Sequence, residues 1–428
     1  MLDRTQAPAV KPFEFRPLPP EIVEILPNGI HFHRYSGGDQ PVCNLLLSFS
    51  GGVEESPSEY EIQMCMALMQ EGTATRTGAQ IAEDLDFCGA RMQRSVSSHY
   101  AGINTMMLNS GLDNVLPILG DMVANATFPA DAVAAARNRA ISQLQVNLSK
   151  VAYLADRTFA RMVWGENHPN ARTATEEQIR TITSENLLNL KNSTVATRTC
   201  HVFLSGLLDK STIDKVRRFL ESIEAPGAGI TPVIIPAAPE SPRIEYTDKP
   251  GSLQSAIAAG MPAIGRTHPD YIPLRIAVTA LGGYFGSRLM SNIREDKGYT
   301  YGISSYLSGT AEGSFVQISA QCDNSYTHAV IDEIRNELRD LAANPPQGEE
   351  LRRLKLFCST NLVEILDSPI SILGYHATSL FAGIPKGYFE AQQRAIGALT
   401  PDTIAAMAEL YLRPDSLRIA VAADKSKL

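Results

Sequence analysis

The chain has 428 residues, which is too long for one ordinary hydrophobic core and favours two domains of roughly 200 residues each. A hydrophobic fraction of 44% and a charged fraction of 20% are typical of a water-soluble globular protein. The net charge of −8 argues against a nucleic-acid partner, which would favour a basic face. The composition fits a cytosolic and a periplasmic protein equally well.

Residues 1–20 are polar and proline-rich, and we interpret them as an N-terminal extension without a signal-peptide pattern. No run approaches the ~18 apolar residues that span a bilayer. A periplasmic location stays open, because removal of a leader would leave the same sequence. The six cysteines are scattered without C-x-x-C spacing, so we expect isolated thiols and neither a zinc ribbon nor a disulfide framework.

Hydrophobic periodicity predicts a first domain over residues 21–223. It opens with a β-hairpin at 23–35, where Pro27, Asn28 and Gly29 supply the turn. Alternating runs then predict strands, and apolar residues with a period of 3.6 predict helices. The strands are expected at 42–50, 90–98, 102–109 and 199–205, and the helices at 58–70, 77–88, around Val115–Val123, and at 130–161, 183–193 and 211–223.

Six prolines fall between residues 224 and 250, and this composition predicts an extended linker. Residues 251–428 then repeat the plan of the first half. The expected elements are strands at 252–261, 299–308 and 313–322, helices at 269–281 and 286–295, an amphipathic helix through Ile331 and Leu341, and a long helix after the segment NPPQGEE, residues 344–350. The similar order indicates duplicated α+β domains, each a mostly antiparallel β-sheet with helices packed on it.

The stretch EGTATRTGAQIAEDLDFCGA, residues 71–90, is similar to the "GT…IAE.LE..GA" pattern of the M16 (pitrilysin/insulinase-type) zinc peptidases. In that family H-x-x-E-H precedes this pattern on a helix, where both histidines bind zinc and the glutamate polarises the attacking water. A further glutamate on a long helix completes the site. Because ENHPNARTATEEQIRTITSENLLNL also resembles an M16 segment, the resemblance covers most of the first half and implies two LuxS-like metallohydrolase-type halves.

The metal-binding positions of the family carry other residues here. Gln63, Met66 and Ala67 stand where the motif has its two histidines and its glutamate, and Gln143 stands at or next to the fourth position. No Asp or Glu occurs between Asp131 and Asp156, so a small shift of the alignment restores no ligand. The resemblance therefore implies a degenerate zinc site, with no metal in this chain and zinc in a partner subunit.

The second half contains LGGYFGSRLMSNIREDKGYTYGISS, which resembles the M16 C-terminal pattern "LGG.FSSRL…IRE..GL.Y.." over its whole length. In that family an arginine and a tyrosine seven residues apart bind the substrate backbone and help to stabilise the oxyanion. The matching residues are Arg294 and Tyr301. A purely structural reading stays open, because a cation is favoured near a helix C-terminus and a tyrosine is an ordinary strand residue.

The resemblance implies the non-catalytic, substrate-binding subunit of a heterodimeric M16 metallopeptidase, paired with an H-x-x-E-H-containing subunit and acting on peptides. Peptides are expected to add a strand at the sheet edge after the lost motif, Arg91–Ser98. The isolated chain is expected to have no peptidase activity. Two alternatives stay open: a scaffold subunit, as in the core subunits of a respiratory complex, which would also allow a homodimer, and an enzyme with an unrecognised site. His31 and His33 share a strand face, and we interpret them as structural or solvated rather than metal-binding.

Overall fold

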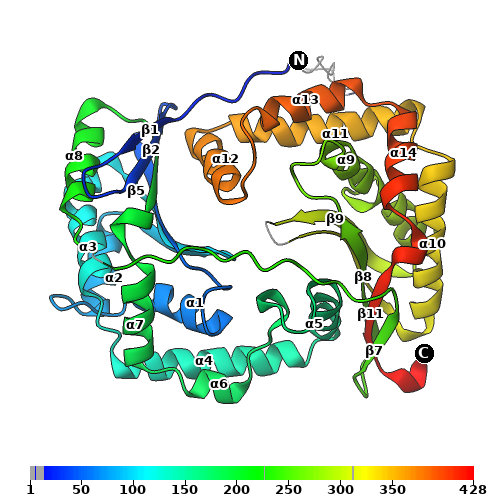
Figure 1. Cartoon of the computed structure of the whole chain (residues 1–428), viewed down its shortest axis with the longest axis horizontal. Coiled ribbons are helices and arrows are strands. Elements are labelled where there is room, and N and C mark those ends of the chain that lie inside the picture. Colours follow the sequence, from blue (N-terminus) through cyan, green and yellow to red (C-terminus); the bar gives the residue numbers. More distant parts are fainter. Residues whose placement is uncertain (1–4, 6–13, 226, 311–312) are drawn as a thin grey trace.

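A computed structural model describes residues 5, 14–225, 227–310 and 313–428 of the chain. These residues form two β-sheets with helices packed against them, and Figure 1 shows the sheet of the first half on the left and that of the second half on the right. The predicted α+β fold with two similar halves is confirmed.

The first sheet consists of six strands: β1 (Ile22–Ile25), β2 (His31–Ser36), β3 (Val42–Ser50), β4 (Arg91–Val96), β5 (Tyr100–Leu108) and β6 (His201–Gly206). Their order across the sheet is β1-β2-β6-β3-β5-β4. Strands β2 and β6 are parallel and the other neighbours are antiparallel. The predicted hairpin is confirmed as β1 and β2, and the predicted edge strand is confirmed as β4, which lies at the end of the sheet.

The second sheet repeats this topology without a counterpart of β1. Its strands are β7 (Ile244–Asp248), β8 (Gln254–Ala263), β9 (Thr300–Gly309), β10 (Ser314–Asp323) and β11 (Arg418–Ala423), in the order β7-β11-β8-β10-β9. Here β7 and β11 form the parallel pair, as β2 and β6 do in the first sheet. The shared order supports the predicted duplication.

The helices of the first half are α1 (Glu59–Leu68), α2 (Gly78–Phe87), α3 (Leu112–Asn125), α4 (Ala130–Leu148), α5 (Val151–Trp164), α6 (Glu176–Arg180), α7 (Ser184–Thr194) and α8 (Lys210–Ser222). Alternate residues of β3, among them Leu45, Leu47 and Phe49, point to one face of the sheet and are buried in a core that α1, α3 and α8 share. That face is the outer face of the sheet.

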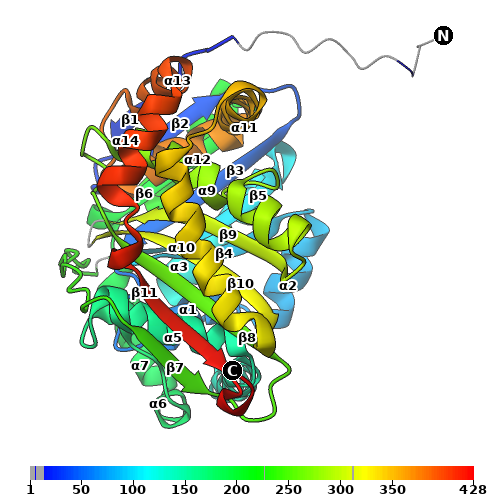
Figure 2. The same ribbon diagram turned by 90° about the vertical axis from the view of Figure 1, so that its right-hand side faces the viewer.

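The helices of the second half are α9 (Tyr271–Gly282), the π-helix η4 (Met290–Asp296), α10 (Thr327–Ala343), α11 (Gly348–Leu366), α12 (Pro369–Phe381), α13 (Tyr388–Ala398) and α14 (Pro401–Tyr411). Figure 2 shows α10 lying across the outer face of the second sheet. No single helix among the residues described is long and apolar enough to cross a membrane, and α11 and α12 meet that criterion only as a pair bent by 105°.

The single long helix predicted at 130–161 is wrong, because the structure has two helices, α4 and α5. The chain leaves the helical conformation at Lys150, whose φ of −95° and ψ of 125° are extended, while the hydroxyl of Ser149 donates to the carbonyl of Val146. The break lets α5 turn away from α4 and bury Phe159 against the second sheet. This tertiary contact offsets the loss of helical continuity.

The two halves exchange one helix each. Helix α5 packs on the inner face of the second sheet, against β8 and β11, and α12 packs on the inner face of the first sheet, against β2 and β6. Both helices follow the long helix of their own half and lie between the two sheets in Figure 1. Each half therefore supplies part of the core of the other.

The described residues of the proline-rich stretch, 224–225 and 227–243, have no regular secondary structure, and β7 begins at Ile244. The last part of the predicted linker, 224–250, is therefore a strand of the second sheet. The residues before it run along the end of α5, where the N–H groups of Ala238 and Glu240 donate to the carbonyls of Trp164 and Met162 at 2.9 and 2.8 Å. The domain limits themselves stay a prediction.

Candidate functional site

Helix α1 carries three of the four positions at which the sequence predicts a degenerate metal site. Ser58 caps its N-terminus by accepting from the N–H of Glu61. Met66 is buried and Ala67 half-buried, and both line a cavity of about 430 Å³ together with Gln93 and Arg94 of the edge strand β4. Gln63 is exposed on the same helix and does not line this cavity.

Gln143 lies on α4, which packs against α1. Its side chain is exposed and its amide donates to Asn147 on the same helix at 2.9 Å, so it turns along its own helix and does not line the cavity beside Met66. Two of the four predicted positions, Met66 and Ala67, are thus brought to one cavity, and Gln63 and Gln143 stay outside it.

The loop after α1 is fixed by a buried carboxylate, Asp121 of α3. Burial opposes the ionisation of Asp121, but the hydrogen bonds that it accepts outweigh burial and lower its pKa to about 2. The donors are the hydroxyls of Thr73 and Thr75 at 2.6 Å, the guanidinium of Arg76 and the amide of Asn125 at 2.8 Å. Thr73, the threonine of the Gly-Thr pair that follows the lost motif, therefore has a structural role, which is to hold this loop against α3.

Tyr301 projects from a β-bulge at the start of β9. Ile303 pairs with Ala320 and Thr300 with Cys322, so that Tyr301 and Gly302 together face the single residue Gln321. The hydroxyl of Thr300 donates to the carbonyl of Gln321 and accepts from the N–H of Gly302 at 3.1 Å. A bulge of this kind redirects side chains, and the ring of Tyr301 is left 90% exposed.

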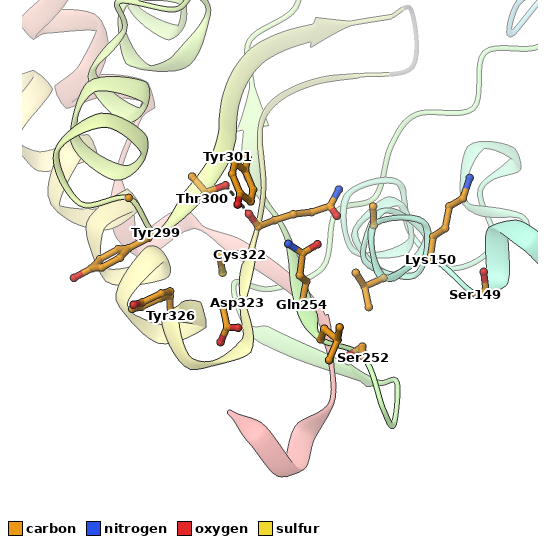
Figure 3. A pocket seen from close by; sticks show the side chains of 15 residues that line it. Ser149, Lys150, Ser252, Gln254, Tyr299, Thr300, Tyr301, Cys322, Asp323 and Tyr326 are labelled. Carbon is orange, nitrogen blue, oxygen red and sulfur yellow. Dashed lines mark hydrogen bonds between the residues drawn. The ribbon is translucent and has the colours of Figure 1, made fainter.

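Tyr301 lines two adjoining cavities on the inner side of the second sheet, of about 810 and 420 Å³. Figure 3 shows the larger one, with Tyr301 and Gln254 on one side and the start of α5, at Lys150, on the other. Asp156 of α5 lines the smaller cavity, where desolvation raises its pKa. Helix α5, which the first half contributes, is thus a wall of the cavities around Tyr301.

Arg294 lies in the π-helix η4, and helical segments of this rare type occur often at functional sites. Its guanidinium carbon is 5.0 Å from the ring centroid of Phe285, a cation–π contact with a ring that is 61% exposed. Arg294 lines neither cavity at Tyr301. The structure therefore does not bring the predicted pair to one cavity.

A neighbouring arginine fixes the segment that carries Arg294. Arg288 donates to both carboxylate oxygens of Glu350, at 2.7 and 3.1 Å, and to Asp340 and the carbonyl of Asn344 at 2.7 Å. These bonds join the turn before η4 to α10 and α11. The residues just before η4 are thus tied to α10 and α11, while the side chain of Arg294 rests on an exposed ring.

Comparison with known proteins identifies this arrangement. Residues 181–356 match the family model described as the peptidase M16 inactive domain. An uncharacterized zinc protease of Streptomyces coelicolor is 23% identical over 295 residues, which cover 67% of this chain and 64% of that protein. The region that contains residues 181–356 belongs to the M16 peptidase family. The chain spans slightly less than two thirds of this Streptomyces relative.

Solved structures share the fold of this chain. A peptidase M16 inactive domain from Pseudomonas fluorescens superimposes with a TM-score of 0.84 at 22% identity and covers 94% of this chain and 98% of that one. A chain of complex III2 from Candida albicans superimposes with a TM-score of 0.74 at 13% identity and covers 94% and 95%. At these identities the likeness concerns the fold alone.

The residues at the M16 metal positions do not fit zinc. A glutamine amide is a poor ligand, a thioether is too soft and too apolar to replace the catalytic glutamate, and an alanine methyl group offers no donor atom. Within the described ranges, no group of three His, Cys, Asp or Glu side chains is placed to hold a metal ion. That this chain works without a metal of its own stays a prediction.

The sequence treats His31 and His33 as an isolated pair, but β6 places a third histidine beside them. His201 is paired with His31 in the parallel register of β2 and β6, and Nδ1 of His201 is 3.1 Å from Nε2 of His33. The signal was present in the sequence, since His201 opens the predicted strand at 199–205. It could be used only with the knowledge that this strand lies next to β2.

Proposed function

We propose that this chain is the non-catalytic, substrate-binding subunit of a heterodimeric M16 zinc metallopeptidase that acts on peptides or unfolded segments. One contrast carries the proposal. Tyr301 is 90% exposed on a bulge over a cavity, whereas Gln63, Met66, Ala67 and Gln143 offer no metal site. A large aromatic side chain left uncovered at a cavity is suited to contact a ligand.

In this proposal the partner subunit, which carries H-x-x-E-H, supplies the zinc and the hydrolytic chemistry. The phenol of Tyr301 and the guanidinium of Arg294 donate hydrogen bonds to the substrate backbone and to the negative charge that develops on the attacked carbonyl oxygen. Arg294 has to turn from Phe285 to act beside Tyr301, so binding of the partner or of the peptide is expected to reposition it.

The free edge of β4 gives an extended peptide a place to bind. Edge strands leave backbone N–H and C=O groups unpaired, and a peptide can add to them as a further strand. The cavity beside β4, with Gln93, Arg94 and the half-buried Ala67 in its wall, would then receive one peptide side chain. This mode selects for extended backbone more than for sequence.

The test is to purify the chain together with an H-x-x-E-H-containing M16 partner and to measure cleavage of a quenched peptide. Tyr301→Phe and Arg294→Ala should each lower kcat/KM by ~10² while assembly, followed by gel filtration, is unchanged. Tyr306→Phe and Arg339→Ala are the matched controls, since both residues are on the same half and line neither cavity at Tyr301. Equal rates in all five proteins would reject the assigned roles.

The alternative is a scaffold subunit without a part in proteolysis. It predicts that the chain forms a stable homodimer or a complex in which neither Tyr301 nor Arg294 affects any rate. Recovery of a complex with an M16 partner whose activity is independent of this chain would favour it. Stoichiometric zinc and peptide cleavage by the isolated chain would instead point to an enzyme in its own right.

A further inference from the structure

The two exchanged helices are seated on very different surfaces. Helix α5 lies on small, fully buried side chains of the second sheet, which are Ala256, Ala258, Ala420 and Ala422. Helix α12 buries Leu373 and Ala377 against Phe203 of the first sheet, in a much smaller cluster. The contact of α12 with β2 and β6, which we call the α12 seam, therefore has fewer fully buried apolar side chains than the contact of α5 with the second sheet.

The α12 seam also contains a chain of titratable side chains. A carboxylate oxygen of Glu21 is 2.8 Å from Nδ1 of His33, and Nε2 of His33 is 3.1 Å from Nδ1 of His201. The ring of His31 stacks on that of His201 at 4.7 Å. From α12 itself, Nδ1 of His376 is 3.8 Å from the other oxygen of Glu21.

Hydrogen-bond geometry limits how many protons this chain can hold. His33 donates from Nδ1 to Glu21, so its contact with His201 requires that one of the two facing nitrogens is unprotonated. With both His33 and His201 protonated, two N–H groups would point at each other across 3.1 Å. In the closed seam one imidazole of this pair can therefore be in the cationic form, with both nitrogens protonated. The other imidazole must then stay neutral.

The remaining neighbours do not relieve that restriction. The rings of Phe381 of α12 and His201 lie edge to face with 6.0 Å between their centroids, and the ring of Tyr100 lies against that of Phe381 at 4.1 Å in a tilted arrangement. The charged neighbours beyond these are Glu21 at the start of β1 and Lys386 after α12, which acts on Glu21. A second imidazolium at His201 would thus be covered by aromatic rings, and among the residues that the structure describes its carboxylate neighbour is Glu21, which is already bonded to His33.

We propose that double protonation of His33 and His201 opens the α12 seam, so that in acid the two halves separate there while they remain joined at α5. The α5 side is anchored independently, by the hydroxyl contact of Thr158 with Thr247 at 2.9 Å and by the stretch before β7, which is bonded to the end of α5. Opening also breaks the bonds from residues 16–19 to α12 and α13, such as Leu18 N–H to Glu390 at 3.0 Å. The inference concerns the chain alone and does not rest on a peptidase partner.

The titration of these groups gives the direction of the effect. Burial, with the nearby His33 and His31, lowers the pKa of His201 to about 4 from its ordinary value of 6.5. A histidine with a depressed pKa binds fewer protons in the closed form, so the closed form is fully stable above pH 6.5 and is lost as the pH falls toward 4. Burial raises the pKa of Glu21, but the bond from His33 and nearby positive charges outweigh it and leave that pKa lowered, which also favours opening in acid.

The size of the effect follows from the same linkage. If His201 returns to its ordinary pKa on opening, the ratio of closed to open chain falls by about 30-fold between pH 7.5 and pH 5. Opening exposes α12 and leaves α5 covered. Hydrogen exchange of α12 therefore reports the opening, and exchange of α5 is the internal reference.

The experiment is hydrogen exchange of the full chain at pH 7.5 and pH 5, corrected for the intrinsic exchange rates. We expect the protection of residues 369–381 to fall by about 30-fold, while that of residues 151–164 stays constant. His201→Gln keeps a hydrogen-bonding partner for His33 and cannot take up the proton, so its α12 protection should change less than about threefold. His328→Gln, an exposed histidine on α10, should behave like the unmodified chain.

His201→Phe, which keeps the ring stack, is the second variant if the glutamine does not fold, and it should give the same flat response. Constant protection of α12 in the unmodified chain would overturn the proposal. So would equal losses in α12 and α5, which indicate general unfolding in acid, and so would an undiminished pH response of both His201 variants.

Discussion

The hydroxyl of Thr300 donates to the carbonyl oxygen of Gln321 at 2.5 Å, across the bulge where the register of β9 and β10 shifts. Tyr301 is the next residue, so this bond helps to fix the backbone from which its ring projects. The same hydroxyl also accepts a hydrogen bond from the N–H of Gly302 at 3.1 Å. The exposed position of Tyr301 is therefore built by its neighbours and does not depend on contacts of the ring itself.

Thr300→Val should keep the shape of the side chain and remove both hydrogen bonds, leaving the carbonyl of Gln321 without its donor. The expected cost is about 1–3 kcal/mol of unfolding free energy, with a loss of activity of the complex similar to that of Tyr301→Phe. Urea unfolding and the quenched-peptide assay measure the two effects. Thr300→Ser retains the hydroxyl and should preserve activity; a complex with Thr300→Val that is as active as the unmodified one would contradict this role.

Asp121→Asn should destabilise the chain, since an amide cannot accept all the hydrogen bonds that converge on the carboxylate. With a pKa lowered to about 2, Asp121 adds stability above its ordinary pKa of 3.8, and this is lost as the pH falls through 2. The expected loss at pH 7 is about 2 kcal/mol, measured by denaturant unfolding. Asp113→Asn, an exposed carboxylate on the same helix, is the control. A difference between the Asp121 variant and the unmodified chain that is as large at pH 2 as at pH 7 would contradict the argument.

Gly260→Ala should weaken the packing of α5 on the second sheet. A Cβ at this position would lie 2.7 Å from Phe159 and 2.1 Å from the carbonyl oxygen of Val316, and neither can move without disturbing the second sheet. We expect a loss of about 2 kcal/mol or more, seen as a lower Tm. Gly265→Ala is the matched control, since its Cβ would meet nothing within 4 Å, and it should leave Tm unchanged. Equal Tm values for both variants would show that the close approach is not needed.

Metal analysis tests the degenerate site directly. The purified chain should contain no stoichiometric zinc, and EDTA should leave its Tm unchanged. The combined variant Gln63→His, Met66→Glu, Ala67→His, Gln143→Glu should bind zinc near one ion per chain, because it restores the family's ligands on α1 and α4. Since Met66 is buried, the glutamate should lower Tm without zinc and zinc should raise it again. Stoichiometric zinc in the unmodified chain would refute the expectation.

The sequence predicts the local elements well because strands and helices here follow their own periodicity. The hairpin at Gly29, the edge strand β4 and the helices α1 and α10 all lie where the apolar pattern places them. The pattern cannot show what depends on distant contacts. The break at Lys150 is one case, since the chain on both sides is a good helix former and only the second sheet gives α5 a reason to turn.

The candidate site was predictable in its residue types and unpredictable in its geometry. The family pattern identifies Met66, Ala67, Arg294 and Tyr301 without a structure. It does not reveal the bulge, because a bulge is a mismatch of two strands and leaves no mark on either alone. Nor does it reveal that Arg294 rests on Phe285, or that His201 completes a chain with His33, since both relations arise from tertiary packing.

The exchange of α5 and α12 has a consequence for any attempt to divide the protein. A cut in the proline-rich stretch would leave the first product with an unseated α5 and the second with an unseated α12, so neither product should fold as a soluble module. The same reasoning applies to the evolution of the protein. In a half-length ancestor, the inner face of the sheet would have been covered by the helix of a second copy of the chain, and its own helix would have covered the sheet of that copy. Pairing would then have come before gene fusion.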